Sequence, residues 1–172
     1  MTLNLSYTVA EVTPNRIADV VAFVQRVMGQ LYPEGKYYKN PYDLTNFAQV
    51  YLEAPNANFY IAEDAEGRII GTVAIRPYDH RFPMLQPQLE KAEACEMTRL
   101  YIDEACRRQG IGSVLYKRAE AFASDAGYTT SYLHTSSYLP GGLSFWISRH
   151  YQELEWETDE IVHMAKPLAR TT

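Results

Sequence analysis

The chain has 172 residues, a length that is enough to bury a core. Of these residues 47% are hydrophobic and 22% are charged, a composition typical of a globular protein. Its formal net charge is −5 and it contains no basic block, which disfavours a nucleic-acid-binding module. No apolar run approaches the length of a membrane span, and the first residues lack the basic and apolar regions of a secretory signal. We expect one domain over residues 1–172, located in the cytoplasm, with neither nucleic acid nor a membrane as a partner.

The spacing of apolar residues predicts helices and strands in the order β-α-α-β-β-β-α-β-α-β-β. The first helix is expected to be capped by Thr13, opened by Pro14 and ended by Gly29. Helices between the strands of the second half imply crossover connections and an α/β fold, with a mixed sheet covered on both faces. The loop 77–93 is long enough to be functional. The predicted strands are 5–12, 59–63, 68–76, 94–102, 128–135, 151–157 and 161–166, and the predicted helices are 14–29, 43–52, 110–126 and 143–149.

The cysteines and histidines indicate neither a disulfide framework nor a metal site. Cys95 and Cys106 lie on either side of one predicted strand and have no paired histidine, so we expect two reduced, non-nucleophilic thiols. His80, His150 and His163 lack the carboxylate or cysteine spacing of metal ligands, and no metal is expected.

The most informative segment joins the strand that ends at Ile102 to the helix that begins near Gly110. Its sequence is Arg-Arg-Gln-Gly-Ile-Gly over residues 107–112. The first turn of a helix has unpaired N–H groups and the positive end of the helix dipole, so this place can bind a pyrophosphate. Gly110 and Gly112 would let the phosphates approach the backbone, although both could instead serve a turn and helix packing. A dinucleotide site is disfavoured because the third glycine of Gly-x-Gly-x-x-Gly is missing.

Four stretches together resemble a known family. Residues 96–102 resemble its central strand, and residues 107–112 match its Arg/Gln-x-x-Gly-x-Gly/Ala loop. Phe145-Trp146-Ile147-Ser148-Arg149-His150-Tyr151 resembles its short helix and following strand, and residues 163–168 resemble its closing strand. In this order they resemble the GNAT family of N-acetyltransferases, which move an acetyl group from acetyl coenzyme A to an amine. The resemblance implies a mixed, mostly antiparallel central sheet flanked by helices.

The resemblance also implies where the acetyl donor, acetyl coenzyme A, would bind. Backbone N–H groups of the glycine loop would hold the pyrophosphate, and the pantetheine arm would pair with residues 100–102 like an added strand. A backbone N–H in that strand would polarise the thioester carbonyl. The implied cofactor-binding residues are Leu100, Tyr101, Ile102, Arg107, Arg108, Gln109, Gly110, Ile111, Gly112, Ser113 and Trp146.

Glu96 is the candidate general base. A carboxylate that faces the cleft can take the proton from an ammonium group, and Glu96 shares the strand parity of Thr98 and Leu100. It could instead be an ion-pair partner of Arg99 or of a lysine on the sheet face. His134, in the next strand, is a second candidate base or a hydrogen-bonded structural histidine.

The general acid departs from the family pattern. Trp146 stands where the family often has a tyrosine, and an indole N–H is not a usable acid. Either the thiolate leaves without help or another hydroxyl serves; Tyr138 is the first substitute, whereas Tyr151 is expected in the core. Trp146 would pack against the donor or simply belong to the core.

The acceptor is expected to be a primary amine of a small molecule or a peptide, acetylated by direct attack because no activated nucleophile is evident. Tyrosines in the loop 31–41, together with Asp79, His80 and Arg81, could line its mouth or form a packed surface. The acidic chain mildly favours a cationic acceptor. The alternatives are an acyl-coenzyme A sensor or scaffold with little transferase activity, and a donor larger than acetyl. Exposed strand edges are compatible with a homodimer.

Overall fold

A computed structural model of the protein describes residues 5–89, 93–137, 139 and 141–169. Seven strands form one sheet in the order β1-β2-β3-β4-β5-β7-β6. All neighbouring strands are antiparallel except β4 and β5, which are parallel, so the expected mixed, mostly antiparallel sheet is confirmed. The strands are β1 (Tyr7–Glu11), β2 (Asn58–Asp64), β3 (Ile69–Pro77), β4 (Ala94–Ile102), β5 (Thr130–Ser136), β6 (Gln152–Trp156) and β7 (Ile161–Pro167).

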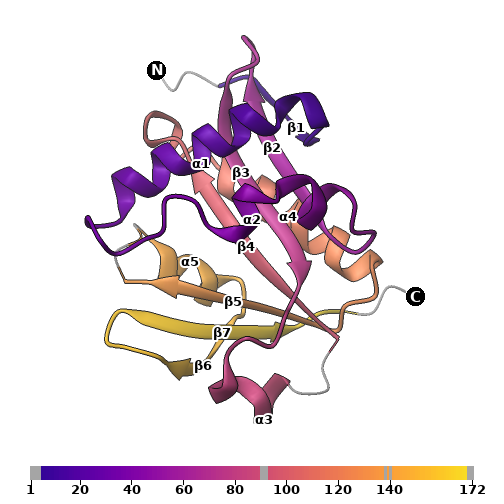
Figure 1. Ribbon diagram of the computed structural model, residues 1–172, viewed down its shortest axis with the longest axis vertical. Helices are drawn as coiled ribbons and strands as arrows, with labels where there is room; N and C mark the ends of the chain where they lie inside the picture. The colour runs from indigo at the N-terminus through magenta and orange to yellow at the C-terminus, as the bar shows by residue number, and fades with distance from the viewer. Residues whose placement is uncertain (1–4, 90–92, 138, 140, 170–172) are drawn as a thin grey trace.

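Helices cover both faces of the sheet, with α1 and α2 in front of the upper strands and α4 behind them in Figure 1. Valines of α1 pack with Phe59 and Ala74 on one face, while Leu115 and Ala119 of α4 pack with Val73 on the other. Burying such apolar side chains is the main source of stability of the layers. The helices are α1 (Ile17–Leu31), α2 (Tyr42–Thr45), α3 (Gln86–Leu89), α4 (Ile111–Asp125) and α5 (Gly142–Ser148).

Three helix predictions need correction. Residues 14–16 form a 3₁₀ turn before α1, and the Thr13 hydroxyl bonds the Asn15 side chain and caps no backbone N–H. Gly29 does not end α1, because apolar spacing continues and the Tyr32 N–H still bonds the Met28 carbonyl.

The predicted helix 43–52 is divided into α2 and a wider π-helical turn, Ala48–Leu52. Asn46 leaves the helical conformation between them, and its side chain donates to the Tyr42 carbonyl at 3.0 Å. This division lets Asp43 and Tyr51 both turn inward. The loop 77–93 is not structureless, because it contains α3 and a preceding 3₁₀ turn.

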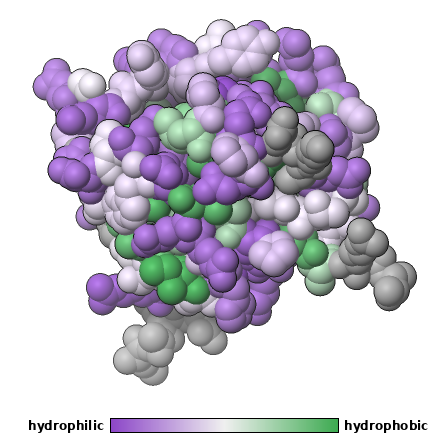
Figure 2. Space-filling model, turned by 90° about the horizontal axis from the view of Figure 1, so that it is seen from below, coloured by the Kyte–Doolittle hydropathy of each residue, from purple (hydrophilic) through white to green (hydrophobic). Residues whose placement is uncertain are grey.

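The surface seen in Figure 2 is largely hydrophilic, and its hydrophobic side chains gather in small groups. Within the part of the chain that the structure describes, no helix has the length and hydropathy needed to span a membrane.

The sheet opens between β4 and β5. The two strands pair only from Ala94–Glu96 to Thr130–Tyr132, and then they diverge. The remainder of β4, up to Ile102, therefore has a free backbone edge toward β5. This opening is where the resemblance expects an added strand, and it leads directly to the N-terminus of α4.

Candidate active site

A pocket of about 1260 Å³ runs through the opening between β4 and β5. It connects the first turn of α4 with the segments 28–43, 79–82 and 158–161. Gln109 is not among its described lining residues, and Tyr138 lies outside the described part of the chain. The predicted site residues that line it are Glu96, Leu100, Tyr101, Ile102, Arg107, Arg108, Gly110, Ile111, Gly112, Ser113 and Trp146.

The two loop glycines have different physical requirements. Gly110 precedes α4 with a left-handed φ of +80°, which an L side chain adopts only with strain. Gly112 has no such restriction: a β-carbon there would meet Ile102 at 3.8 Å, an ordinary contact. The fold itself therefore does not require glycine at position 112. Because Gly112 has no side chain, it leaves open space in front of the helix N-terminus.

A positive side chain that no sequence motif indicates lies beside the same helix turn. Arg149, just after α5, donates a hydrogen bond to the Ser113 hydroxyl and stacks over Phe145, with 4.9 Å between the guanidinium carbon and the ring centre. Arg107 is directed differently, because its Nε donates to the Ile102 carbonyl at 3.3 Å. The first turn of α4 thus combines unpaired N–H groups with a nearby guanidinium.

A β-bulge interrupts β4 beside the opening. Thr72 pairs with Tyr101 while Ala74 pairs with Thr98, so β4 has one additional residue at this point. Arg99 has a left-handed φ of +57°, and its carbonyl accepts a 2.7 Å hydrogen bond from the Thr72 hydroxyl.

The bulge corrects the predicted parity of β4. Tyr101, and not Leu100, shares the face of Glu96 and Thr98, and it packs in the cluster with Ala74. Leu100 packs with the cluster on the α4 face. The sequence alone predicts that side chains alternate regularly along β4. It does not show the additional residue of the bulge, which reverses the alternation after Arg99.

A buried ion pair fixes the bulge. Arg99 donates two hydrogen bonds to the Asp43 carboxylate, at 2.7 and 3.0 Å, and the Tyr51 hydroxyl donates a third at 2.7 Å. Burial would raise the pKa of Asp43, but the hydrogen bond and charge of Arg99 outweigh it and the pKa is lowered. Asp43 therefore joins α2 to the bulge as a buried anion.

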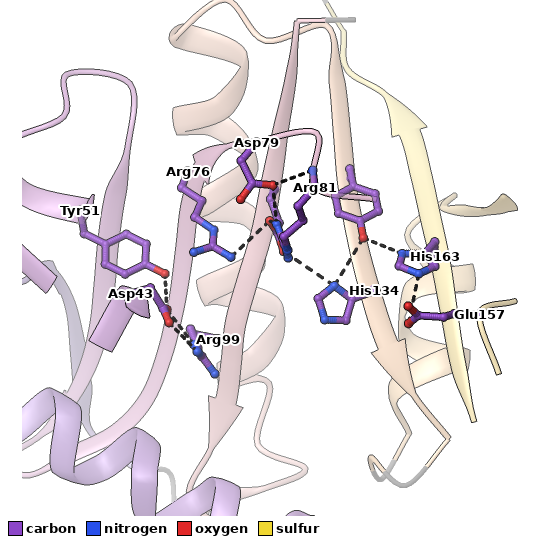
Figure 3. Close-up of polar contacts among 11 residues, drawn as sticks. Asp43, Tyr51, Arg76, Asp79, Arg81, Arg99, His134, Glu157 and His163 are labelled. Atoms are coloured by element: carbon purple, nitrogen blue, oxygen red, sulfur yellow. Dashed lines mark hydrogen bonds and ion pairs between the residues drawn. The ribbon is translucent and has the colours of Figure 1, made fainter. Parts of the chain in front are cut away.

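Glu96 is 1% exposed and is held by Arg81 and Arg76, both of which are labelled in Figure 3. Arg81 binds both of its carboxylate oxygens, at 2.7 and 2.8 Å, and Arg76 binds one at 3.3 Å. Burial would raise the pKa of Glu96, but the hydrogen bond from Arg81 and the charges of both arginines lower it. The carboxylate is therefore ionised and weakly basic.

His134 lies beside this carboxylate, with its Nδ1 3.7 Å from Glu96 and its side chain 39% exposed in the pocket. Although part of the ring reaches the pocket, the protein packed around it desolvates the imidazole and lowers the pKa of His134 to about 4, against the attraction of Glu96. The imidazole is neutral near pH 7, so it has a free lone pair. This arrangement gives the pocket a neutral base beside a fixed negative charge.

A polar chain continues from His134 into the core (Figure 3). The Tyr132 hydroxyl lies 3.4 Å from Nδ1 of His134 and 2.6 Å from Nδ1 of the buried His163. His163 Nε2 has Glu157 as a neighbour at 3.6 Å. Burial lowers the pKa of His163, opposed by the charge of Glu157. These contacts restrict the orientation and tautomer of the His134 ring.

Trp146 is both a core residue and part of the pocket wall, so each of the two interpretations made from the sequence describes it in part. It is 7% exposed and packs edge-on against Phe145 and Tyr151, yet it also lines the pocket. Tyr151 is buried with its hydroxyl 2.6 Å from the Ser131 hydroxyl, so its expected place in the core is confirmed. Both thiols are free, and burial raises the pKa of Cys95 to about 12, which suppresses its nucleophilic thiolate.

Comparison with known proteins agrees with this geometry. A family model described as the acetyltransferase (GNAT) family matches residues 23–151. N-acetyltransferase 8B of Rattus norvegicus is 28% identical over 111 residues, which are 64% of this chain and 46% of that protein. N-acetyltransferase 8 of Homo sapiens is 26% identical over 111 residues, 64% of this chain and 45% of that protein. The chain thus spans less than half the length of these curated relatives.

Solved structures share the fold. An acetyltransferase of the GNAT family from Staphylococcus aureus aligns with a TM-score of 0.76 and 14% identity over 95% of this chain and 100% of that one. The PaiA N-acetyltransferase of Thermoplasma acidophilum, crystallised with coenzyme A, aligns with a TM-score of 0.68 and 16% identity over 95% and 99% of the two chains. The family model matches most of the length of this chain, and the structure has the split sheet and the glycine loop. This chain therefore belongs to the GNAT family of acetyltransferases.

Proposed function

We propose that this protein transfers an acetyl group from acetyl coenzyme A to a primary amine of a small molecule or a peptide by direct attack. One observation carries the proposal: the same pocket joins the first turn of α4, the open edge of β4 and the wall around Glu96 and His134. A donor and an acceptor can therefore meet in it without an acyl-enzyme. The described lining residues include one thiol, Cys106, whose pKa is raised by burial, so a covalent route through it is disfavoured.

The donor end of the pocket fits a pyrophosphate-bearing coenzyme. N–H groups of residues 111–113 are the unpaired donors of α4, and Gly112 leaves space before them. The guanidinium of Arg149 lies behind them, on the Ser113 hydroxyl, and is not among the described residues that line the pocket. The free edge of β4 offers backbone groups to an extended amide chain. Acetyl coenzyme A would supply an activated thioester, and the backbone around the bulge at Arg99 would polarise its carbonyl.

Removal of the amine proton requires a base, and two groups share this task in our proposal. Glu96 was the expected base, but its ion pairs with Arg81 and Arg76 make it weakly basic. His134 is neutral, lines the pocket and lies 3.7 Å from Glu96. With a pKa of about 4, His134 is also a weak base. It accepts the proton as the amine bonds to the thioester carbon and its N–H becomes acidic, and the Glu96 carboxylate stabilises the imidazolium that forms.

Departure of the coenzyme A thiolate depends less on a protein acid than the attack depends on a base, because a free thiol has a pKa of about 8.5. Trp146 lines the pocket, and its indole N–H donates no proton to the leaving thiolate. Tyr138 remains the proposed acid, should one be used.

The test measures release of free thiol from acetyl coenzyme A with a panel of primary amines, together with coenzyme binding by calorimetry. Gly112→Val places a branched side chain before the helix N-terminus and should weaken coenzyme binding at least about tenfold. Gly112→Ala is the matched control, because the fold accommodates its methyl group and the family motif accepts alanine. Equal coenzyme affinity of all three proteins would contradict the phosphate-loop assignment. Tight binding without turnover of any amine would favour the sensor or scaffold alternative.

A further inference from the structure

Three partly exposed arginines surround two buried carboxylates at the acceptor end of the pocket. Arg76, Arg81 and Arg99 line it together with two buried carboxylates, Asp43 and Glu96. Arg99 binds Asp43 through two hydrogen bonds, and Arg81 binds Glu96 through two. Each carboxylate is therefore held by one arginine in two-point geometry, which leaves Arg76 without an equivalent partner.

Arg76 makes one weak hydrogen bond, from Nη2 to a Glu96 oxygen at 3.3 Å that also binds Arg81 at 2.7 Å. Its side chain is 22% exposed. In the described structure, any nitrogen atom of Arg76 that has no hydrogen-bond partner is therefore open to solvent. The guanidinium has five N–H groups. The remaining ones are thus accessible from the pocket that Arg76 lines.

Among the described charged groups of this wall, Glu96 is the ion-pair partner of Arg76, and the positive charge of Arg76 also lowers the pKa of Asp43 and Asp79 from a longer distance. Asp79 binds Arg81 at 2.8 Å and is 56% exposed, so water screens it. Lys36 and Glu160 lie at another part of the lining and are 3.9 Å from each other. The free donors of Arg76 thus face the acceptor space with a charge that is only partly neutralised.

We propose that the acceptor bears a carboxylate near its primary amine, as in an amino acid, and that Arg76 binds this carboxylate. The inference rests on the proposed acetyl transfer and names its substrate class. Arg76 and His134 contact the two oxygens of the same carboxylate, Glu96 (Figure 3). Their separation is therefore short enough for one small molecule to place its carboxylate on Arg76 and its amine near His134.

This assignment differs from the expectation based on the net charge of −5, which favours a cationic acceptor. The two guanidiniums beside Glu96 would repel an acceptor with only a positive charge, whereas a zwitterion offsets the cost with its carboxylate. The same two positive charges favour the neutral form of the bound amine, which is the form that attacks.

The test compares three acceptors that differ in one group: an amino acid, its carboxamide, and the amine without the carboxyl group. In the wild-type protein, kcat/KM should be about tenfold to a hundredfold higher for the amino acid than for the carboxamide, the range of a charge-assisted contact. Arg76→Gln should reduce this ratio to near one, and Arg76→Lys should keep part of it. Arg68→Gln is the matched control, because Arg68 is 77% exposed in the β2–β3 turn and should leave the ratio unchanged.

Three results would overturn the assignment while leaving the acetyl transfer intact. The first is equal use of the amino acid and the carboxamide by the wild-type protein. The second is an Arg76→Gln variant, shown to be folded by circular dichroism, that loses activity equally toward all three acceptors. The third is a preference for a peptide without a carboxylate near its amine. Failure of every amine to release thiol would instead contradict the proposed function itself.

Discussion

The substitution Asp43→Asn tests whether the buried ion pair holds the bulge in β4. Asp43 is 3% exposed, and it accepts hydrogen bonds from Arg99 and Tyr51. The left-handed conformation of Arg99 has an intrinsic cost of about 1–3 kcal/mol, so it persists only because neighbouring contacts determine it. The neutral amide that replaces the carboxylate would leave the guanidinium charge buried without an anion.

Removing one partner of a buried ion pair costs about 3–5 kcal/mol. For a chain of this length, each kcal/mol lowers the Tm by about 2–4 °C, so the expected decrease is about 6–20 °C. Arg99 lowers the pKa of Asp43 in the folded state, so the stabilisation is present above the ordinary aspartate pKa of 3.8 and is lost as the pH falls through the lowered value. The difference between the two proteins should therefore persist from neutral pH down to about pH 4.

Urea unfolding at pH 7 measures this free energy. Asp19→Asn is the control, because Asp19 is 67% exposed in its ion pair with Arg16 and its loss should cost at most about 1 kcal/mol. Because the bulge lies at the donor strand, Asp43→Asn should also raise the KM for acetyl coenzyme A. A loss of stability no larger than that of Asp19→Asn would refute the assigned role of the pair.

The remaining predictions concern protons and thiols. Glu96→Gln should lower kcat, most strongly at low pH where the amine is protonated, and an unchanged pH profile would remove Glu96 from the reaction. Because burial lowers the pKa of His134 to about 4, the unfolded chain binds a proton at His134 first, so stability should fall as the pH drops from about 6.5 toward 4. Urea unfolding of His134→Gln should show a smaller fall, and an identical fall would contradict the assigned pKa direction. With its pKa raised to about 12, Cys95 should resist alkylation at pH 8 in the folded protein, and rapid labelling of Cys95 seen by mass spectrometry would contradict its burial.

The order of elements could be predicted because it depends on local patterns. Period-two and period-3.6 spacing located the seven strands and the two long helices within a few residues. The glycine loop was equally evident, because its chemistry depends on the backbone of a short contiguous segment. The sequence before α4 therefore predicts the donor end of the pocket.

The acceptor end could not be predicted in the same way, because its contacts join distant segments. Arg81 comes from the loop after β3 and reaches Glu96 in β4, while Asp43 comes from α2 and reaches Arg99. The bulge that changes the parity of Leu100 is visible only in the pairing of β3 with β4. A sequence pattern contains no information on which arginine faces which carboxylate, so Glu96 was predicted without its partners.

The most direct test of the proposed activity is to incubate the protein with isotope-labelled acetyl coenzyme A and an amino acid. Mass spectrometry then quantifies the N-acetylated product and the protein itself, while a thiol assay follows coenzyme A. We predict one labelled N-acetyl product for each thiol released, with no acetyl group left on the protein. Coenzyme binding without any N-acetylated product, or label that accumulates on the protein before product forms, would contradict direct acetyl transfer in this pocket.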